Sequence, residues 1–230
     1  MKVLKSTRNS HIEANKRRNL AVVVLLLVLS EFIIALGARI TSWLLLAAVL
    51  PVLAVPIFLR RYDVWKAGST GEKSVVRELQ GLDDSYYLVS SVVLPGSRGD
   101  IDQVLLGANG VFVIETKNYS GKVVCDGDNW YRIKRGTRDA VRTESLSKQV
   151  KRNASQLRRF IHDTTQISLH VNPVLVFVHP AVHLELNNPT VPVLRPGELA
   201  GFIRGFESPF RLGEEQLELL GESIREASAR

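Results

Sequence analysis

Residues 99–121 read GDIDQVLLGANGVFVIETKNYSG, two apolar runs separated by the letters GANG. Two apolar runs that flank a short turn containing Gly and Asn predict a β-hairpin. Side chains two residues apart on a strand share one face of the sheet, so Glu115 and Lys117 point to the same side. The stretch therefore predicts a hairpin that carries charged side chains beside a buried surface.

The turn leaves two registers open for this hairpin. A turn at residues 108–109 places Asp102 opposite Glu115. The favoured type I′ turn at residues 109–110 places Asp102 opposite Lys117 instead. Directly opposed residues share a face, so both registers bring the three charged side chains to one side of the sheet.

Carboxylates next to a core are costly unless they are paired or bound to a metal ion, so this convergence needs a reason. One interpretation is a solvated salt bridge at the open end of the hairpin. The other is a divalent-metal site, in which Asp102 and Glu115 supply oxygen ligands and Lys117 orients or activates a water molecule.

Further motifs precede and follow the hairpin. In chain order they are residues 68–72 (GSTGE), residues 99–102 (GDID), residues 111–121 (VFVIETKNYSG) and Gln149. This succession resembles the nuclease-related domain (NERD) family of the PD-(D/E)XK nuclease superfamily over residues 68–180. The resemblance implies an α/β (α+β) fold, with a restriction-endonuclease-like mixed sheet core and flanking helices.

The resemblance also implies roles for individual residues. Asp102 and Glu115 are the implied metal ligands, for Mg²⁺ or Mn²⁺. Lys117 is the implied catalytic lysine, Glu72 an accessory acid, and Gln149 an active-site amide. The expected partner is nucleic acid, and the expected reaction is metal-dependent hydrolysis of phosphodiester bonds in DNA or RNA.

Two of these assignments have alternatives. The Pro-Asp pair of the superfamily name is absent here, so Asp100 and Asp102 both fit the aspartate role, and the alignment with the long apolar run favours Asp102. Glu72 falls in the first turn of a helix expected over residues 71–82, where an acid also complements the helix dipole.

The N-terminal part of the chain is strongly apolar. Residues 20–38 and 40–59 are each long enough to span about 30 Å of hydrocarbon as a helix. Six Lys/Arg precede the first run, and only Arg39 lies between the two runs. The positive-inside rule then predicts an integral, multi-pass protein of the cell membrane, with both termini and the globular domain in the cytoplasm.

The expected organisation follows from these features. It comprises a basic cytoplasmic tail (1–19), a transmembrane hairpin (20–59), a linker (60–67), the nuclease-like domain (68–180) and a C-terminal helical extension (181–230). The single cysteine, Cys125, excludes an internal disulfide.

Residues 132–159 contain ten Lys/Arg and two acids, whereas residues 60–230 as a whole contain 23 Lys/Arg and 21 Asp/Glu. A helix expected over residues 146–160 carries the cations that we predict to contact nucleic-acid phosphates. These are Lys148, Lys151, Arg152, Arg158 and Arg159. A merely solvated helix face and a contact with anionic lipid are the alternatives.

The remaining patterns complete a mixed α/β domain. Residues 86–94 predict a strand that joins the hairpin in an antiparallel meander. Residues 122–124 and 130–133 predict a second hairpin, and the apolar run 174–178 predicts a central strand beside the meander. The sequence favours a membrane-anchored nuclease. The alternatives are a catalytically weak nucleic-acid- or protein-binding module on the same fold, and a membrane scaffold.

Overall fold

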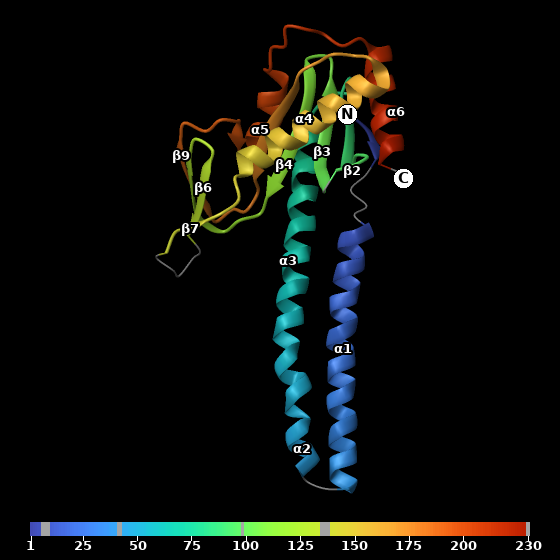
Figure 1. Cartoon of the computed structure of the whole chain (residues 1–230), viewed down its shortest axis with the longest axis vertical. Helices are drawn as coiled ribbons and strands as arrows, with labels where there is room; N and C mark the ends of the chain where they lie inside the picture. Colours follow the sequence, from blue (N-terminus) through green and yellow to red (C-terminus); the bar gives the residue numbers. More distant parts are fainter. Residues whose placement is uncertain (6–9, 41–42, 98, 134–138, 229–230) are drawn as a thin grey trace. The chain divides into compact units, whose positions relative to one another are not determined.

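The computed structural model divides into two compact units (Figure 1). The residues that it describes are 1–5, 10–40, 43–97, 99–133 and 139–228. The first unit comprises Met1–Arg8 and Gly71–Arg230 and contains both β-sheets. The second unit, Asn9–Thr70, contains the apolar helices.

The second unit consists of α1 (Ser10–Arg39), α2 (Trp43–Ala47) and the larger part of α3 (Val49–Leu79). Two segments, Glu13–Arg39 and Leu45–Leu79, are long and apolar enough to cross a membrane. This criterion rests on length and composition, and the core helix of a soluble protein or a signal sequence also meets it. Only 17% and 11% of the two apolar windows are buried within the structure, which disfavours a soluble core.

The larger sheet of the first unit has the strand order β1-β2-β3-β4-β8-β10 among the described residues. Its strands are β1 (Lys2–Lys5), β2 (Tyr87–Val93), β3 (Asp100–Gly107), β4 (Gly110–Lys117), β8 (Val171–Phe177) and β10 (Val193–Leu194). The strands β2, β3 and β4 form the predicted antiparallel meander. The apolar strand β8 pairs with β4 in parallel, so the sheet is mixed, as predicted.

The β3–β4 hairpin adopts the first of the two registers. Gly107 pairs with Gly110, and the ladder continues to Gln103 and Ile114. The turn therefore lies at residues 108–109 and is not the type I′ turn at 109–110. Gly110 has φ 142°, a conformation that glycine adopts more readily than any residue with a side chain.

A smaller four-stranded sheet has the order β7-β6-β5-β9 among the described residues. It contains β5 (Gly121–Asp126), β6 (Asn129–Ile133), β7 (Val141–Arg142) and β9 (Val182–Asn187). The second hairpin expected from the sequence is the β5–β6 pair. Its strand β5 carries the buried Cys125.

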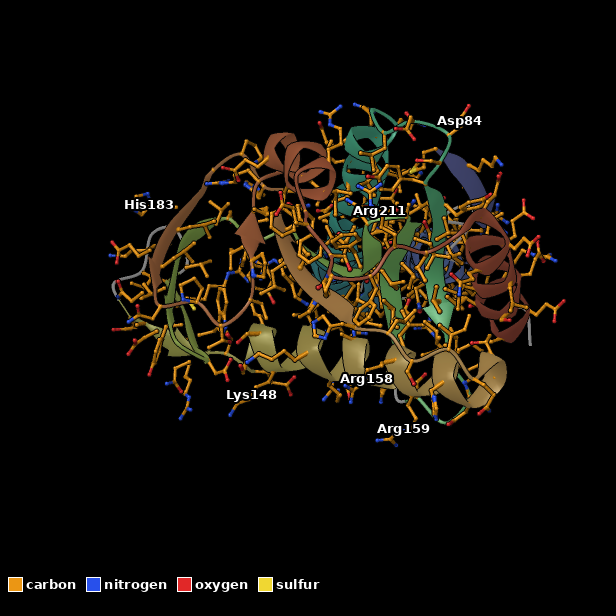
Figure 2. All side chains as sticks on the ribbon, turned by 90° about the horizontal axis from the view of Figure 1, so that it is seen from above. Asp84, Lys148, Arg158, Arg159, His183 and Arg211 are labelled. Atoms are coloured by element: carbon orange, nitrogen blue, oxygen red, sulfur yellow. The ribbon has the colours of Figure 1, made fainter. Side chains whose placement is uncertain are left out.

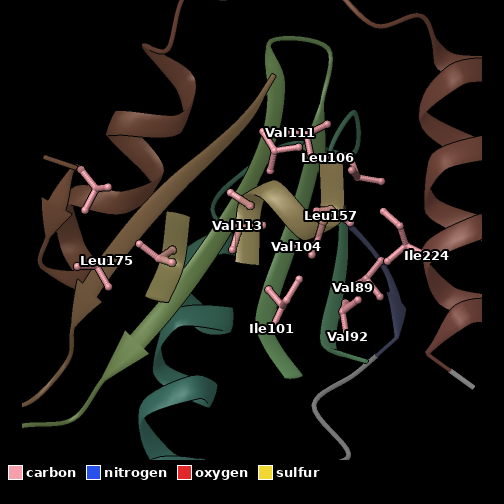
Figure 3. Close-up of a cluster of buried hydrophobic side chains, with 14 of the residues drawn as sticks. Val89, Val92, Ile101, Val104, Leu106, Val111, Val113, Leu157, Leu175 and Ile224 are labelled. Carbon is pink, nitrogen blue, oxygen red and sulfur yellow. The ribbon is translucent and has the colours of Figure 1, made fainter. Parts of the chain in front are cut away.

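Helices cover both faces of the larger sheet. On one face lie α4 (Leu146–Thr165) and α6 (Glu214–Ala227), whose residues Leu157 and Ile224 point toward the valine-rich strands (Figure 3). The last turns of α3 and the helix α5 (Pro196–Arg204) cover the other face. Burying both faces explains why β4 and β8 are apolar without alternation.

The structure differs from the sequence-based organisation in three places. Residues 2–5, predicted to belong to a tail, form β1 and pair in parallel with β2 at the sheet edge. The predicted linker, residues 60–67, is helical and lies inside α3. The predicted helical extension, residues 181–230, begins with β9 and β10, which add a strand to each sheet.

Candidate functional site

The hairpin register brings the acidic residues of β3 and β4 together. Continuing the β3–β4 ladder from Gln103 and Ile114 places Asp102 opposite Glu115. The main-chain N–H of Thr116 donates a hydrogen bond to Asp102 Oδ2 at 2.7 Å. Asp102 is thus fixed against β4 at the point where the hairpin ladder ends.

Lys117 and Gln149 complete a buried network around Glu115, which is only 4% exposed. Lys117 Nζ lies 2.7 Å from Glu115 Oε1 and 3.1 Å from Gln149 Oε1. Gln149 Nε2 donates to the same Glu115 oxygen at 2.7 Å. The structure therefore joins Glu115, Lys117 and Gln149 directly, although they come from a strand and from the first turns of α4.

Asn153 belongs to this network and was not predicted. Its Nδ2 donates to Glu115 Oε2 at 3.3 Å, so both carboxylate oxygens accept hydrogen bonds from α4. Asn153 lies four residues after Gln149, the spacing that places two side chains on one helix face. A polar residue four positions after Gln149 was the only signal available in the sequence.

Burial is the largest single influence on the pKa values of Asp102 and Lys117. Burial raises the pKa of Asp102 well above its usual range, and the nearby carboxylates of Glu115 and Glu72 raise it further. Burial alone would lower the pKa of Lys117, but its ion pair with Glu115 outweighs this effect, so the pKa of Lys117 is raised. Lys117 therefore remains a cation at neutral pH.

Asp102 and Glu115 are the residues of the site that could hold a divalent cation. Asp102, Glu115 and Glu72 interact electrostatically, and Lys117 is the cation paired with Glu115. A second source of positive charge would relieve the repulsion that raises the pKa of Asp102. Among the described residues no group of three or more His, Cys, Asp or Glu side chains is arranged to hold a metal ion. A pair of carboxylates suits Mg²⁺, which retains several water ligands.

Glu72 lies at the end of α3 that packs against the sheet. A Cβ atom at the preceding residue, Gly71, would lie 2.9 Å from Val178 Cγ2 and 3.4 Å from Thr116 Cγ2. The glycine therefore allows α3 to approach the ends of β4 and β8. This close approach accounts for the Gly-Glu pair of the GSTGE motif. It places Glu72, 8% exposed, within electrostatic range of Asp102.

The two candidate aspartates differ in their surroundings. Asp100 is exposed at the start of β3, opposite Val93, whereas Asp102 is partly buried and bonded to β4. The β2 residue facing Asp102 is Ser91, which has φ 51° and interrupts the β2–β3 ladder. Non-glycine residues in this conformation are strained and concentrate at functional sites. Nothing in the sequence indicates this feature.

The predicted phosphate-contacting cations lie along α4, but not all of them are equally available. Lys148, Arg158 and Arg159 lie on the side of α4 that faces away from the sheets (Figure 2). Arg152 is also exposed. Lys151 instead forms an ion pair with Asp128 of the β5–β6 turn, with Nζ 3.0 Å from Oδ1.

Asp128 is the centre of a second polar network, which holds the smaller sheet against α4. Its carboxylate accepts hydrogen bonds from Ser147 Oγ at 2.6 Å, from Thr190 Oγ1 and from Lys151 Nζ. These bonds lower the pKa of Asp128 below its usual range. Trp130 Nε1 in turn donates to Ser147 Oγ at 3.0 Å. These contacts link the β5–β6 turn to α4, and no metal-binding group of three or more His, Cys, Asp or Glu occurs in the described part of the chain.

Comparison with known proteins identifies the segment that carries the site. A family model described as "Nuclease-related domain" (NERD) matches residues 67–178, which include Glu72, Asp102, Glu115, Lys117 and Gln149. An uncharacterized protein from Bacillus anthracis is 40% identical over 82 residues, which amount to 34% of this chain and 37% of that protein. The alignment thus spans little more than a third of that relative. No solved structure matches the chain.

Proposed function

From the nuclease-related domain formed by residues 67–178, we propose that this protein is a metal-dependent nuclease that hydrolyses phosphodiester bonds in DNA or RNA. The observation that carries the proposal is the buried contact of Lys117 with both Glu115 and Gln149, next to the partly buried Asp102. A solvated salt bridge would not require a glutamate that is 4% exposed and bonded through both oxygens.

Each residue has a distinct role in the proposed reaction. Asp102 and Glu115 would hold a divalent cation, which supplies Lewis-acid activation of the phosphodiester and of a bound water. The Lys117 ammonium stabilises the negative charge that develops when the water oxygen attacks phosphorus and the P–O bond to the leaving oxygen breaks. Gln149 and Asn153 keep Glu115 oriented, and Glu72 adds negative charge beside Asp102.

The experiment that tests this proposal uses the full chain in detergent micelles. A fragment that starts after the apolar helices would lack β1 and leave the edge of β2 unpaired. Labelled single-stranded and duplex DNA and RNA are incubated with Mg²⁺, with Mn²⁺ and with a chelator. We expect cleavage in the presence of metal and none with chelator. Binding without cleavage under every metal condition would contradict the enzyme and favour a binding module.

The same assay distinguishes the two aspartates. Asp102→Asn is expected to reduce cleavage by roughly 10²-fold or more, because it removes a charge at the centre of the site. Asp100→Asn is the matched control and is expected to change the rate by less than about threefold, since Asp100 is exposed at the strand start. The reverse ranking would transfer the metal-ligand role to Asp100 and leave the metal mechanism intact.

We also propose that the two apolar segments anchor the domain to the cytoplasmic face of the cell membrane. Their length, their composition and the basic residues before α1 support this assignment. The pairing of β1 with β2 supplies an independent argument. Because both strands belong to one sheet, they lie on the same side of any membrane that the intervening helices cross. An even number of crossings satisfies this condition.

Reporter fusions test the topology. A reporter placed before Met1 and one placed after Arg230 are both expected to behave as cytoplasmic. The measurement is alkaline phosphatase activity, which requires export, alongside fluorescence of a green fluorescent protein fusion, which does not. A reporter that is exported at either end would contradict the two-span arrangement. Two cytoplasmic reporters on a chain that washes off the membrane with carbonate would contradict membrane integration.

A further inference from the structure

Three adjoining cavities line the side of α4 near α5 and the start of β8. Their volumes are about 520, 360 and 190 Å³. The first shares Ser155 and Arg158 with the second, and it shares His170, Asn172 and Phe206 with the third. The three therefore form one continuous depression. We call it the α4–α5 groove, and its defining residues are Ser155, Arg158, His170, Asn172, Phe206 and Phe210.

The ionisable side chains that line the groove are basic. Arg158 and His170 line the largest cavity, and Arg159 and His162 line the second. None of the residues that line the three cavities, all within the part of the chain that the structure describes, is an aspartate or glutamate. Lys151 also borders the groove but is paired with Asp128. Within the described part of the chain Arg158 and Arg159 form no ion pair, so the groove offers the positive charge of these two arginines to an anion.

Aromatic rings supply the second feature of the groove. Phe206 lines two of its cavities and packs edge-on against Phe112, at 5.1 Å between ring centroids. Phe210 lines the third cavity and is 73% exposed. The groove therefore contains an exposed aromatic ring in one cavity and arginines in the two cavities that adjoin it. The combination of stacking rings with cations is how proteins hold unpaired nucleotides.

We propose that the α4–α5 groove binds unpaired nucleotides of a single-stranded nucleic acid, which makes single strands the substrate class of the nuclease site. This inference rests on the proposed function. Arg158 and Arg159 contact phosphates, and a base stacks on Phe210. In a duplex the bases are stacked on one another and paired, so their faces are not available to Phe210.

The groove and the nuclease site lie on one helix. Gln149 contacts Lys117 near the start of α4, and Arg158 follows nine residues later, which corresponds to about 13 Å along the helix axis. Lys148, Arg152 and Arg159 are exposed between and around these points. At 3.6 residues per turn, nine residues make about two and a half turns, so Arg158 projects from the side of α4 opposite Gln149. A single strand that occupies the groove would therefore have to cross α4 over Lys148, Arg152 and Arg159 to reach the nuclease site.

The test measures binding without hydrolysis. The full chain in detergent micelles is titrated, in the presence of chelator, into a labelled oligothymidylate and into a duplex of equal length. Fluorescence anisotropy gives both affinities over a series of salt concentrations. We expect the oligothymidylate to bind more tightly than the duplex. Equal affinity for both would contradict the single-strand assignment.

Two variants locate the binding to the groove. Phe210→Ala should weaken oligothymidylate binding about tenfold, since it removes one stacking surface. Arg158→Gln should lower the slope of log affinity against log salt by about 0.7, the value for one phosphate contact with a single strand. The matched controls are Leu219→Ala, an exposed apolar residue of α6, and Arg77→Gln, an exposed arginine of α3. Neither control should change the affinity by more than about twofold.

The outcomes separate this inference from the proposed function. Unchanged oligothymidylate affinity in Phe210→Ala and Arg158→Gln, together with metal-dependent cleavage by the wild type, would reject the groove and leave the nuclease. No binding of any oligonucleotide would reject both. Arg158→Gln that weakens binding to phosphatidylserine vesicles, but not to oligothymidylate, would assign the groove to a lipid headgroup and also overturn the proposal.

Discussion

Replacing Lys117 with methionine is expected to reduce metal-dependent cleavage by roughly 10²- to 10⁴-fold, the range typical of a group that assists proton transfer or stabilises charge in the transition state. The substitution has a second consequence. Glu115 is 4% exposed and would lose its paired cation. Leaving a buried carboxylate unpaired costs about 3–5 kcal/mol, so the variant should also unfold more readily.

A double variant separates the loss of chemistry from the loss of stability. Glu115→Gln combined with Lys117→Met removes both charges, while the single amide oxygen can still accept the hydrogen bond that Gln149 donates. We expect it to regain most of the stability lost by Lys117→Met, as measured by denaturant unfolding, and to remain inactive. Recovery of cleavage together with stability would show that Lys117 acts only in folding.

The ion pair between Lys122 and Glu185 supplies the matched control. It joins β5 to β9, and its side chains are 39% and 45% exposed. Exposed ion pairs contribute little to stability. Lys122→Met should therefore change the free energy of unfolding by less than about 1 kcal/mol and leave cleavage unaltered.

Asp128→Ala is expected to destabilise the attachment of the smaller sheet to α4 by about 2–3 kcal/mol, because a carboxylate that accepts several hydrogen bonds is lost. Cys125 offers a local reporter for this effect. It is buried in β5, and burial raises the pKa of its thiol to about 11, so the native protein should react slowly with thiol reagents. Asp128→Ala should accelerate labelling at neutral pH by more than tenfold.

The control for this experiment is Asp126→Ala. Asp126 is exposed at the end of β5, directly before the turn that contains Asp128, and its charge raises the pKa of the Cys125 thiol as that of Asp128 does. The Asp126 variant therefore reproduces the electrostatic effect on the thiol without breaking the contacts to Ser147 and Lys151. If both variants accelerate labelling equally, the network around Asp128 does not hold the sheet in place.

The pH dependence of this contribution has a defined sign. The pKa of Asp128 is lowered in the folded protein, so its stabilising effect is complete above the ordinary aspartate value of about 3.9. The effect is lost as the pH falls through the lowered folded-state pKa. Denaturant unfolding should show a constant difference between wild type and Asp128→Ala from neutral pH to about pH 5. The difference should narrow below about pH 4.

The sequence predicted the hairpin, the meander and the convergence of Asp102, Glu115 and Lys117, because side-chain alternation on strands depends only on spacing. It did not predict the register. Both candidate registers keep the same side chains on the same faces, so the apolar pattern could not distinguish them. The observed pairing of Gly107 with Gly110 differs from the type I′ preference of Asn109-Gly110.

Contacts between distant segments were the least predictable part of the site. Asn153 reaches Glu115 across 38 residues, and Ser147 reaches Asp128 across 19. Neither residue belongs to a motif that the sequence reveals. The prediction of α4 as a phosphate-contacting helix placed Lys151 among the free cations, whereas its ion pair with Asp128 depends on the position of a turn in another sheet. Such pairings are set by tertiary structure.

The position of β1 has a consequence for biosynthesis. Residues 2–5 are synthesised before α1, α2 and α3, but their partner in the sheet begins at Tyr87, after these helices. β1 can pair with β2 only after the helices have been synthesised and, in the proposed membrane topology, inserted. A chain with only one inserted helix would hold β1 on the wrong side of the bilayer, and the space over Gly221 of α6, which the Leu4 side chain occupies, would stay unfilled. In the proposed topology the sheet can be completed only when both helices are inserted. Folding of the domain would then depend on correct insertion of its own membrane anchor.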